Sequence, residues 1–202
     1  MECSKTAADT ASSCSVRGVI MNAIKQINKI MDNTTMQTRK DGMLWYKRLN
    51  RFCRDLGIKY NQPTWKVTAI MSALSPRTSF ANNIHDTEQL LKYGKDAYLK
   101  SPLFRKKAIA IYNASCYNEV QKLFSEKTGR KTLSFWENIN DLTSDRATID
   151  IHMIRHLKIK GSLTAKKYRE AEKALQDYAK QVNIKPYQLQ AIIWCTVRGK
   201  SF

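Results

Sequence analysis

Apolar residues recur at spacings of three and four along most of the chain, the period expected when one face of an α-helix is buried. The first series is Ile20, Ile24, Ile27 and Met31, and later series are separated mainly by glycine and proline. No stretch has the alternating pattern of a convincing β-strand. The pattern predicts an all-α protein of roughly nine to eleven helices.

The expected helix limits follow from these interruptions. After a helix that starts at Val16, a second contains Leu44 to Leu56 and ends at Gly57, and a third runs from Pro63 to Leu74. Further helices are expected near 82–93, 102–112, 120–124, 132–139, 149–159, 168–182 and 186–197. Residues 1–15 are small and polar, so we expect a mobile tail there.

The chain is strongly basic, with 35 lysine and arginine residues against 17 aspartate and glutamate residues and a net charge of +18. Residues 39–66 carry eight basic and two acidic side chains, and residues 92–107 carry six and one. A lysine-rich surface or a ribosome-associated protein would also be basic, but this clustering favours a nucleic-acid phosphate backbone. We therefore expect double-stranded DNA as the partner.

Cysteine usage argues against several kinds of site. The five cysteines are scattered and form no CxxC pair, which fits neither a disulfide framework nor a zinc or iron–sulfur centre: Cys3, Cys14, Cys53, Cys116 and Cys195. No metal and no cofactor are expected. No apolar run approaches the ~20 residues of a membrane span, and a signal-peptide pattern is absent. We expect a monomer in a reducing cytoplasm, the host's if the protein is viral.

Two segments contain candidate chemistry. The stretch 124–132 is a short basic turn before a helix, which can direct backbone N–H groups at a phosphate or can simply be a basic loop with a glycine stop. Asp150 lies where irregular chain becomes a helix, so an N-cap role is expected, which leaves catalysis open. His152 taken alone is more typical of a structural side chain than of a metal ligand.

These segments, in this order, resemble the helix–hairpin–helix DNA glycosylase superfamily, whose familiar members are endonuclease III-like enzymes. That family has a hairpin L-P-G-x-G-x-K-T-A followed by V-D-x-H-x-x-R, and the matching residues here are Gly129, Lys131, Thr132, Ile149, Asp150, His152 and Arg155. Upstream, 72–78 (SALSPRT) resembles the family's S-A-Q-x-T loop, and 104–108 (FRKKA) resembles its Y-x-x-K-A segment. The resemblance covers about residues 60–160.

The resemblance implies a fold of two helical lobes with a cleft between them. A helical barrel would comprise residues 61–144, and residues 16–60 and 145–202 would form the other lobe. DNA would be kinked and one nucleotide flipped into the cleft. Neutral Lys131 would attack C1′ of the flipped sugar, and Asp150 would stabilise positive charge or activate the nucleophile. The implied DNA contacts are Ser75, Arg77, Lys107, Lys127, Gly129, Arg130, Thr132, His152 and Arg155.

Departures from the family pattern keep other functions open. Lys127 replaces the first hairpin glycine, Ser125-Glu126 replaces the leading Leu-Pro, and Leu74 replaces the wedge glutamine. The four-cysteine iron–sulfur cluster of many members is absent. The chain is also similar to small bacteriophage proteins of this fold, some suggested to act on hypermodified thymine. The leading hypothesis is a DNA glycosylase, with or without lyase activity, for a modified or damaged base. The alternatives are a transferase that elaborates modified thymine and a non-catalytic DNA-binding protein.

Overall fold

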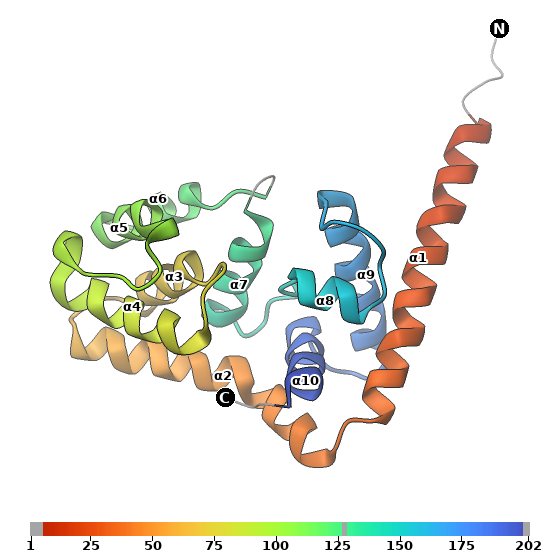
Figure 1. The fold of residues 1–202 in the computed structure, drawn as a ribbon, viewed down its shortest axis with the longest axis horizontal. Helices are drawn as coiled ribbons and strands as arrows, with labels where there is room; N and C mark the ends of the chain where they lie inside the picture. Colours follow the sequence, from red (N-terminus) through yellow and green to blue (C-terminus); the bar gives the residue numbers. More distant parts are fainter. Residues whose placement is uncertain (1–5, 127–128, 200–202) are drawn as a thin grey trace, which may run out of the picture. The chain divides into compact units, whose positions relative to one another are not determined.

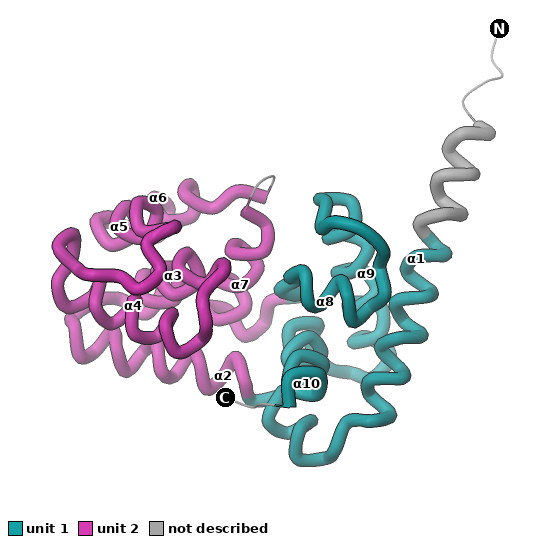
Figure 2. Tube along the Cα trace, in the orientation of Figure 1, with its two compact units in different colours: residues 1–44, 145–202 teal, residues 45–144 magenta. Residues whose placement is uncertain are grey.

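The computed structural model describes residues 6–126 and 129–199. Within them the chain forms ten α-helices and two short 3₁₀-helices, and contains no β-strand (Figure 1). The all-α expectation is therefore confirmed for the described part of the chain. The chain divides into two compact units, residues 1–44 with 145–202 (unit 1) and residues 45–144 (unit 2) (Figure 2).

Unit 1 is a bundle of helices from both ends of the chain. It contains α1 (Thr6–Asp32), α8 (Ile151–His156), α9 (Ala165–Gln181) and α10 (Pro186–Arg198), and α9 contacts each of the other three. Ile27 and Met31 of α1 are buried in its core, and Ile20 and Ile24 pack against that core. The spacing of three and four in the sequence thus identified the face of α1 that packs on α9 and α10.

The expected mobile tail at residues 1–15 stays a prediction, and the structure has α1 beginning at Thr6. Residues 1–5 lie outside the described part of the chain. Low hydrophobicity shows that a segment does not bury a core face, but it does not prevent a helix that is nucleated further along from extending through it. Three alanines between Thr6 and Ser15 favour this extension.

Unit 2 is built around α3 (Thr64–Leu74), in which every residue from Val67 to Leu74 is buried. Helices α4 (Phe80–Tyr93), α5 (Arg105–Asn113), α6 (Tyr117–Leu123) and α7 (Arg130–Asn140) pack against α3. The 3₁₀-helices η1 (Gly94–Asp96) and η2 (Pro102–Phe104) lie between α4 and α5. A helix buried on all sides needs apolar or internally hydrogen-bonded side chains all round, and α3 has both.

Helix α2 (Met36–Lys59) is longer than expected at both ends and passes through Gly57. The glycine does not stop the helix; it makes room for the returning chain, because a Cβ there would lie 2.6 Å from the carbonyl oxygen of Gln62. The turn is made by Asn61, which has a φ of 51°. Its neighbour Gln62 then donates its N–H to the Gly57 carbonyl at 2.8 Å. The two compact units meet within α2, between Leu44 and Trp45, and the lobe boundary expected after residue 60 stays a prediction.

The first turns of α2 are packed closely against α10 within unit 1. A Cβ at Gly42 would lie 2.5 Å from the Cα atom of Ile192, which is closer than non-bonded carbon atoms approach. A backbone atom cannot swing away as a side chain can. Glycine at position 42 is therefore required by the approach of the two helix backbones.

The helix that carries Asp150 is also shorter than expected. The sequence pattern predicted a helix over 149–159, whereas α8 spans only Ile151–His156. Ile149 is buried, but its N–H donates to the Tyr168 hydroxyl at 3.2 Å and so is used outside a helix. At the other end, Lys158 has a φ of 53°, which ends the helix before Gly161.

Candidate functional site

The turn that leads into α7 positions Lys131. Gly129 is the residue before the helix, and its N–H donates to the Ser125 carbonyl at 2.9 Å. The Thr132 hydroxyl donates to the Gly129 carbonyl at 2.9 Å, and the Arg130 guanidinium lies 2.8 Å from the Glu126 carboxylate. Lys131 is half-buried in the first turn of α7. Residue 127 lies outside the described part, so the expected phosphate contact of Lys127 stays a prediction.

The end of α3 lies against the start of α7. The Ser72 hydroxyl donates to the Thr132 carbonyl at 2.5 Å, and the Ser75 hydroxyl donates to the Ser72 carbonyl at 2.9 Å. Two residues further on, Arg77 is exposed and has a φ of 58°. A non-glycine residue in this left-handed region is uncommon, and here it turns the chain out of α3. Unit 2 thus places Ser75, Thr132 and the loop that carries Arg77 near one another.

Lys107 of α5 packs beneath the same turn. Its Nζ lies 3.8 Å from the ring centre of Phe124, and Phe124 stacks on Trp136 with 4.9 Å between ring centres. Burial lowers the pKa of the Lys107 ammonium from 10.5 to about 8. An amine that loses its proton near neutral pH can act as a nucleophile. Lys107 was expected only to contact DNA, and its burial makes it a second amine of interest next to Lys131.

Asp150 is the N-cap of α8, as the sequence predicted. Its Oδ1 accepts the N–H of Met153 at 2.8 Å. This bond fixes the carboxylate at a helix start, where the helix dipole also favours negative charge. The side chain is half-buried rather than enclosed.

Helix α9 holds the extended segment that precedes Asp150. Three side chains at spacings of four on α9 bond to its backbone, namely Tyr168, Glu172 and Gln176. The buried Tyr168 hydroxyl donates to the Ala147 carbonyl at 2.9 Å, and the Glu172 carboxylate accepts the Ala147 N–H at 3.2 Å. Gln176 donates to the Asp145 carbonyl at 3.0 Å. The sequence pattern placed Tyr168 at the start of the helix expected near 168–182 and missed this role, because spacing identifies a helix but not its partner.

The histidine of the D-x-H-x-x-R segment has a neighbour that the sequence analysis did not single out. His152 and Arg155 are exposed on α8, and His156 lies one turn after His152. Burial lowers the pKa of His156, the charges of His152 and Arg198 lower it further, and Asp150 acts in the opposite direction. The i, i+4 spacing of the two histidines was the available signal.

The candidate residues are divided between the two units. Unit 1 carries Asp150, His152 and Arg155, whereas unit 2 carries Ser75, Arg77, Lys107, Gly129, Arg130, Lys131 and Thr132. Each unit organises its own set through the contacts given above. The expectation that Lys131 and Asp150 face a single cleft concerns residues of different units and stays a prediction.

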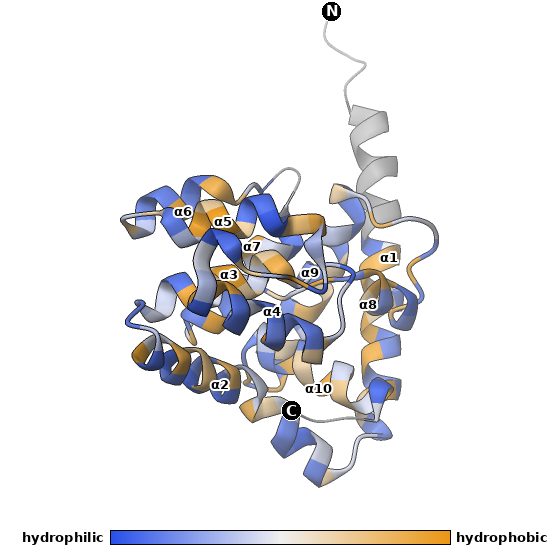
Figure 3. Ribbon diagram, turned by 60° about the vertical axis from the view of Figure 1, so that its left-hand side comes forward, coloured by the Kyte–Doolittle hydropathy of each residue, from blue (hydrophilic) through white to orange (hydrophobic). Residues whose placement is uncertain are grey.

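One face of α2 is basic. Lys47, Arg51 and Arg54 are exposed at spacings of four and three, whereas Trp45, Leu49 and Cys53 are buried on the other face. Hydrophilic and hydrophobic positions accordingly alternate around α2 in Figure 3. Arg54 lies 3.8 Å from Asp55, but both side chains are solvent-exposed, so this ion pair is weak. We call Lys47, Arg51 and Arg54 the α2 stripe, and all three lie within unit 2.

Among the described residues, no three histidine, cysteine, aspartate or glutamate side chains are grouped as metal ligands would be. No helix of the described part is long and apolar enough to span a membrane.

The chain belongs to a family of unknown function, DUF7178, whose family model matches residues 8–201. No curated protein and no solved structure matches the chain. Family membership therefore assigns no activity to the chain.

Proposed function

We propose that the protein binds duplex DNA and acts on a base flipped out of the duplex, as a DNA glycosylase with lyase activity. The observation that carries the DNA-binding part is the exposed α2 stripe in a chain of net charge +18. Side chains three and four residues apart share one helix face, so Lys47, Arg51 and Arg54 can follow a phosphate backbone together. The proposal that the target is a flipped base rests on the resemblance to the DNA glycosylase motifs, which occur in the same order at Gly129–Thr132 and Ile149–Arg155.

The proposed chemistry assigns one role to each unit. The neutral Lys131 amine attacks C1′ of the flipped sugar, the C1′–N bond to the base breaks, and the departing base takes the bonding electrons and a proton from the amine. The C1′–O4′ bond of the sugar ring then breaks, O4′ takes a proton from solvent, and the nitrogen on C1′ becomes a protonated Schiff base between protein and DNA. The Asp150 carboxylate stabilises the positive charge that develops on the sugar. Two observations support these roles: Lys131 lies in a helix turn fixed by Gly129 and Thr132, and Asp150 is fixed by its cap bond to Met153.

A DNA-binding protein without catalysis is the second candidate. Its supporting observation is that Oδ1 of Asp150 caps α8, which is a sufficient structural reason for an aspartate at this position. The masses of the nucleosides recovered from treated DNA separate the possibilities. A glycosylase leaves a free base and an abasic site, a transferase leaves a heavier base, and a binding protein leaves the DNA unchanged.

If the protein binds DNA phosphates, its affinity for duplex DNA should depend steeply on salt concentration. With roughly five to eight phosphate contacts, the logarithm of the association constant should fall against the logarithm of salt concentration with a slope of about −4 to −7. Replacing Lys47, Arg51 and Arg54 together by glutamine should make the slope shallower by about two to three, because each phosphate contact contributes about 0.9. Fluorescence anisotropy with a labelled duplex measures both slopes.

Lys173 of α9 supplies a matched control for this titration. It is exposed and forms an ion pair with Asp177 one turn away, so its charge is already matched by a carboxylate. Lys173→Gln should change the slope by less than about 0.9, which is the contribution of one phosphate contact. An affinity that does not weaken between low and moderate salt contradicts phosphate binding, and so does a triple variant with the slope of the wild type.

A further inference from the structure

The segment between α4 and α5 exposes an aromatic ring in a basic part of unit 2. Tyr98 is 80% exposed, while its neighbours Ala97 and Leu99 are 1% and 4% exposed. No other large apolar side chain described in unit 2 is as exposed as Tyr98. Because the residues on both sides are anchored in the core, the backbone directs the Tyr98 ring outward.

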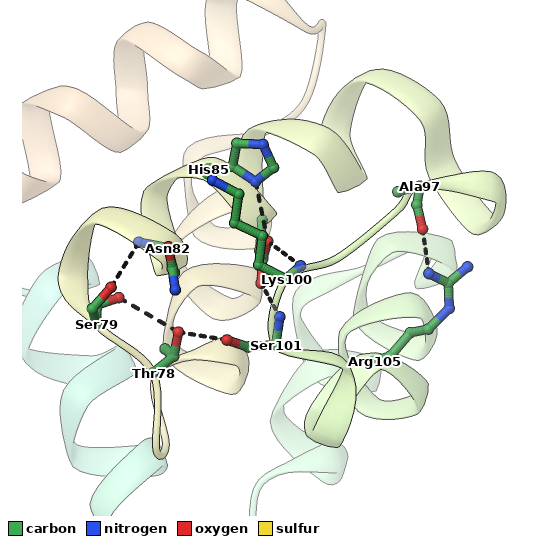
Figure 4. A network of polar contacts seen from close by, with 9 residues as sticks. Thr78, Ser79, Asn82, His85, Ala97, Lys100, Ser101 and Arg105 are labelled. Carbon is green, nitrogen blue, oxygen red and sulfur yellow. Dashed lines mark hydrogen bonds and ion pairs between the residues drawn. The ribbon is translucent and has the colours of Figure 1, made fainter.

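Hydrogen bonds hold the backbone on both sides of Tyr98 (Figure 4). After it, the fully buried Asp86 carboxylate accepts the N–H groups of Lys100 at 2.8 Å and of Ser101 at 2.9 Å. Before it, the Arg105 guanidinium donates to the carbonyls of Lys95 and Ala97. A ring presented by a fixed backbone loses little conformational entropy when it binds a ligand.

The loop that carries Arg77 is joined to this segment. The Thr78 and Ser101 hydroxyls are 2.7 Å apart, and both residues appear in the network of Figure 4. Arg77, Lys95 and Lys100 are all exposed, and Asp96 is the only acidic residue between positions 92 and 107. We call Arg77, Lys95, Tyr98 and Lys100 the Tyr98 surface. It combines an accessible ring with positive charge, so its complement is a polyanion that carries flat rings.

We propose that the Tyr98 surface binds an unpaired nucleotide of DNA, with the phenol ring stacked on the base and the basic side chains contacting the flanking phosphates. This inference rests on the proposed DNA binding and adds a substrate class, DNA that contains an unpaired or single-stranded stretch. In a continuous duplex each base face is covered by its neighbours, so a protein ring can stack only where a base has left the stack.

Binding to a gapped duplex tests the stacking role. The probes are a fully paired duplex and a duplex of equal length with a gap of about four unpaired nucleotides. Tyr98→Ala should weaken binding to the gapped duplex about 5- to 150-fold, the range expected when one stacking aromatic is removed. Tyr98→Phe keeps the ring and should bind within about twofold of the wild type, and none of these changes should alter binding to the paired duplex by more than about twofold.

Tyr93 is the matched control. It is 50% exposed at the end of α4, and the Lys92 Nζ lies 4.8 Å from its ring centre. Tyr93→Ala removes an exposed tyrosine of the same unit that lies outside the hydrogen-bonded segment from Lys95 to Ser101. It should leave the affinities for the paired and the gapped duplex unchanged. Because Tyr93 and Tyr98 are both surface residues, their loss should preserve the helical circular dichroism signal, and this is checked for each variant.

Stacking by Tyr98 and binding of duplex DNA predict different results with the two probes. Wild-type protein that binds both duplexes equally, or a Tyr98→Ala loss that is the same on both, overturns the stacking role and leaves duplex binding intact. If Tyr98→Phe loses as much affinity for the gapped duplex as Tyr98→Ala, the hydroxyl rather than the ring makes the contact. That result also overturns stacking. Wild-type protein that binds neither duplex removes the proposed function together with this inference.

Discussion

We expect the substitution Asp150→Asn to lower turnover of a substrate DNA about 10²- to 10³-fold while the protein stays folded. Removing one preorganised electrostatic group at a site of developing charge typically has this effect. Asparagine can still accept the Met153 N–H that Asp150 accepts at 2.8 Å, so α8 keeps its cap. Turnover is measured as the loss of the modified nucleoside by mass spectrometry, and folding is measured by thermal unfolding.

Asp150→Ala separates catalysis from capping. Alanine removes both the charge and the cap, so this variant should lose about 1 kcal/mol of unfolding free energy in addition to its activity. Equal loss of turnover in both variants, with reduced stability only in Asp150→Ala, assigns the carboxylate to the reaction. Full turnover in Asp150→Asn would leave the N-cap as the whole explanation for the aspartate.

The largest effect on stability is expected for Gly42→Ala. The added methyl group would lie 2.5 Å from the Cα of Ile192, so α2 and α10 have to move apart within unit 1. Overpacking costs about 1–3 kcal/mol, and we expect the upper end because the opposing atoms include backbone. A loss of about 3 kcal/mol lowers the melting temperature of a chain of this size by roughly 6–12 °C.

Gly18→Ala is the matched control for this substitution. Gly18 also lies inside a helix of unit 1, but a Cβ there would meet nothing within 4 Å. Alanine is favoured over glycine in a helix interior by about 1 kcal/mol, so Gly18→Ala should raise the melting temperature slightly. A Gly42→Ala protein as stable as Gly18→Ala would contradict the close approach of α2 and α10.

Helix faces were predictable because burial imposes a period that the sequence displays. Ile27 and Met31 belong to the apolar series that predicted the buried face of α1, and both are buried. The cap at Asp150 was also predictable, since an aspartate before a helical series has a local role that requires no knowledge of the fold.

Features that depend on distant residues were not predictable. Gly42 is needed only because Ile192 lies opposite, and Gly57 is needed within α2 because the chain returns beside it at Gln62. The helix expected from residue 149 begins two residues later, since Asp150 has an extended backbone and Tyr168 of α9 holds the extended segment before it. In each case tertiary contacts overrode a local signal.

In the candidate site, too, local features were predictable and contacts between distant residues were not. The order of its segments suggested a family, but only the structure shows that Ser72 joins α3 to the start of α7 through the Thr132 carbonyl. Lys107, whose pKa is lowered by burial, likewise packs against Phe124, a residue 17 positions away. Sequence order identifies which residue types are present, whereas burial and hydrogen bonds decide what each can do.

Borohydride trapping tests the central claim, that the Lys131 amine attacks C1′ of a flipped nucleotide. Borohydride reduces a Schiff base to a stable amine, so duplex DNA with an abasic site should become covalently joined to the wild-type protein. The account predicts that Lys131→Gln abolishes this complex while duplex affinity changes little, because one positive charge among 35 is lost. Trapping that persists in Lys131→Gln would contradict the account and direct attention to Lys107, and a wild-type protein that forms no covalent complex would contradict it as well.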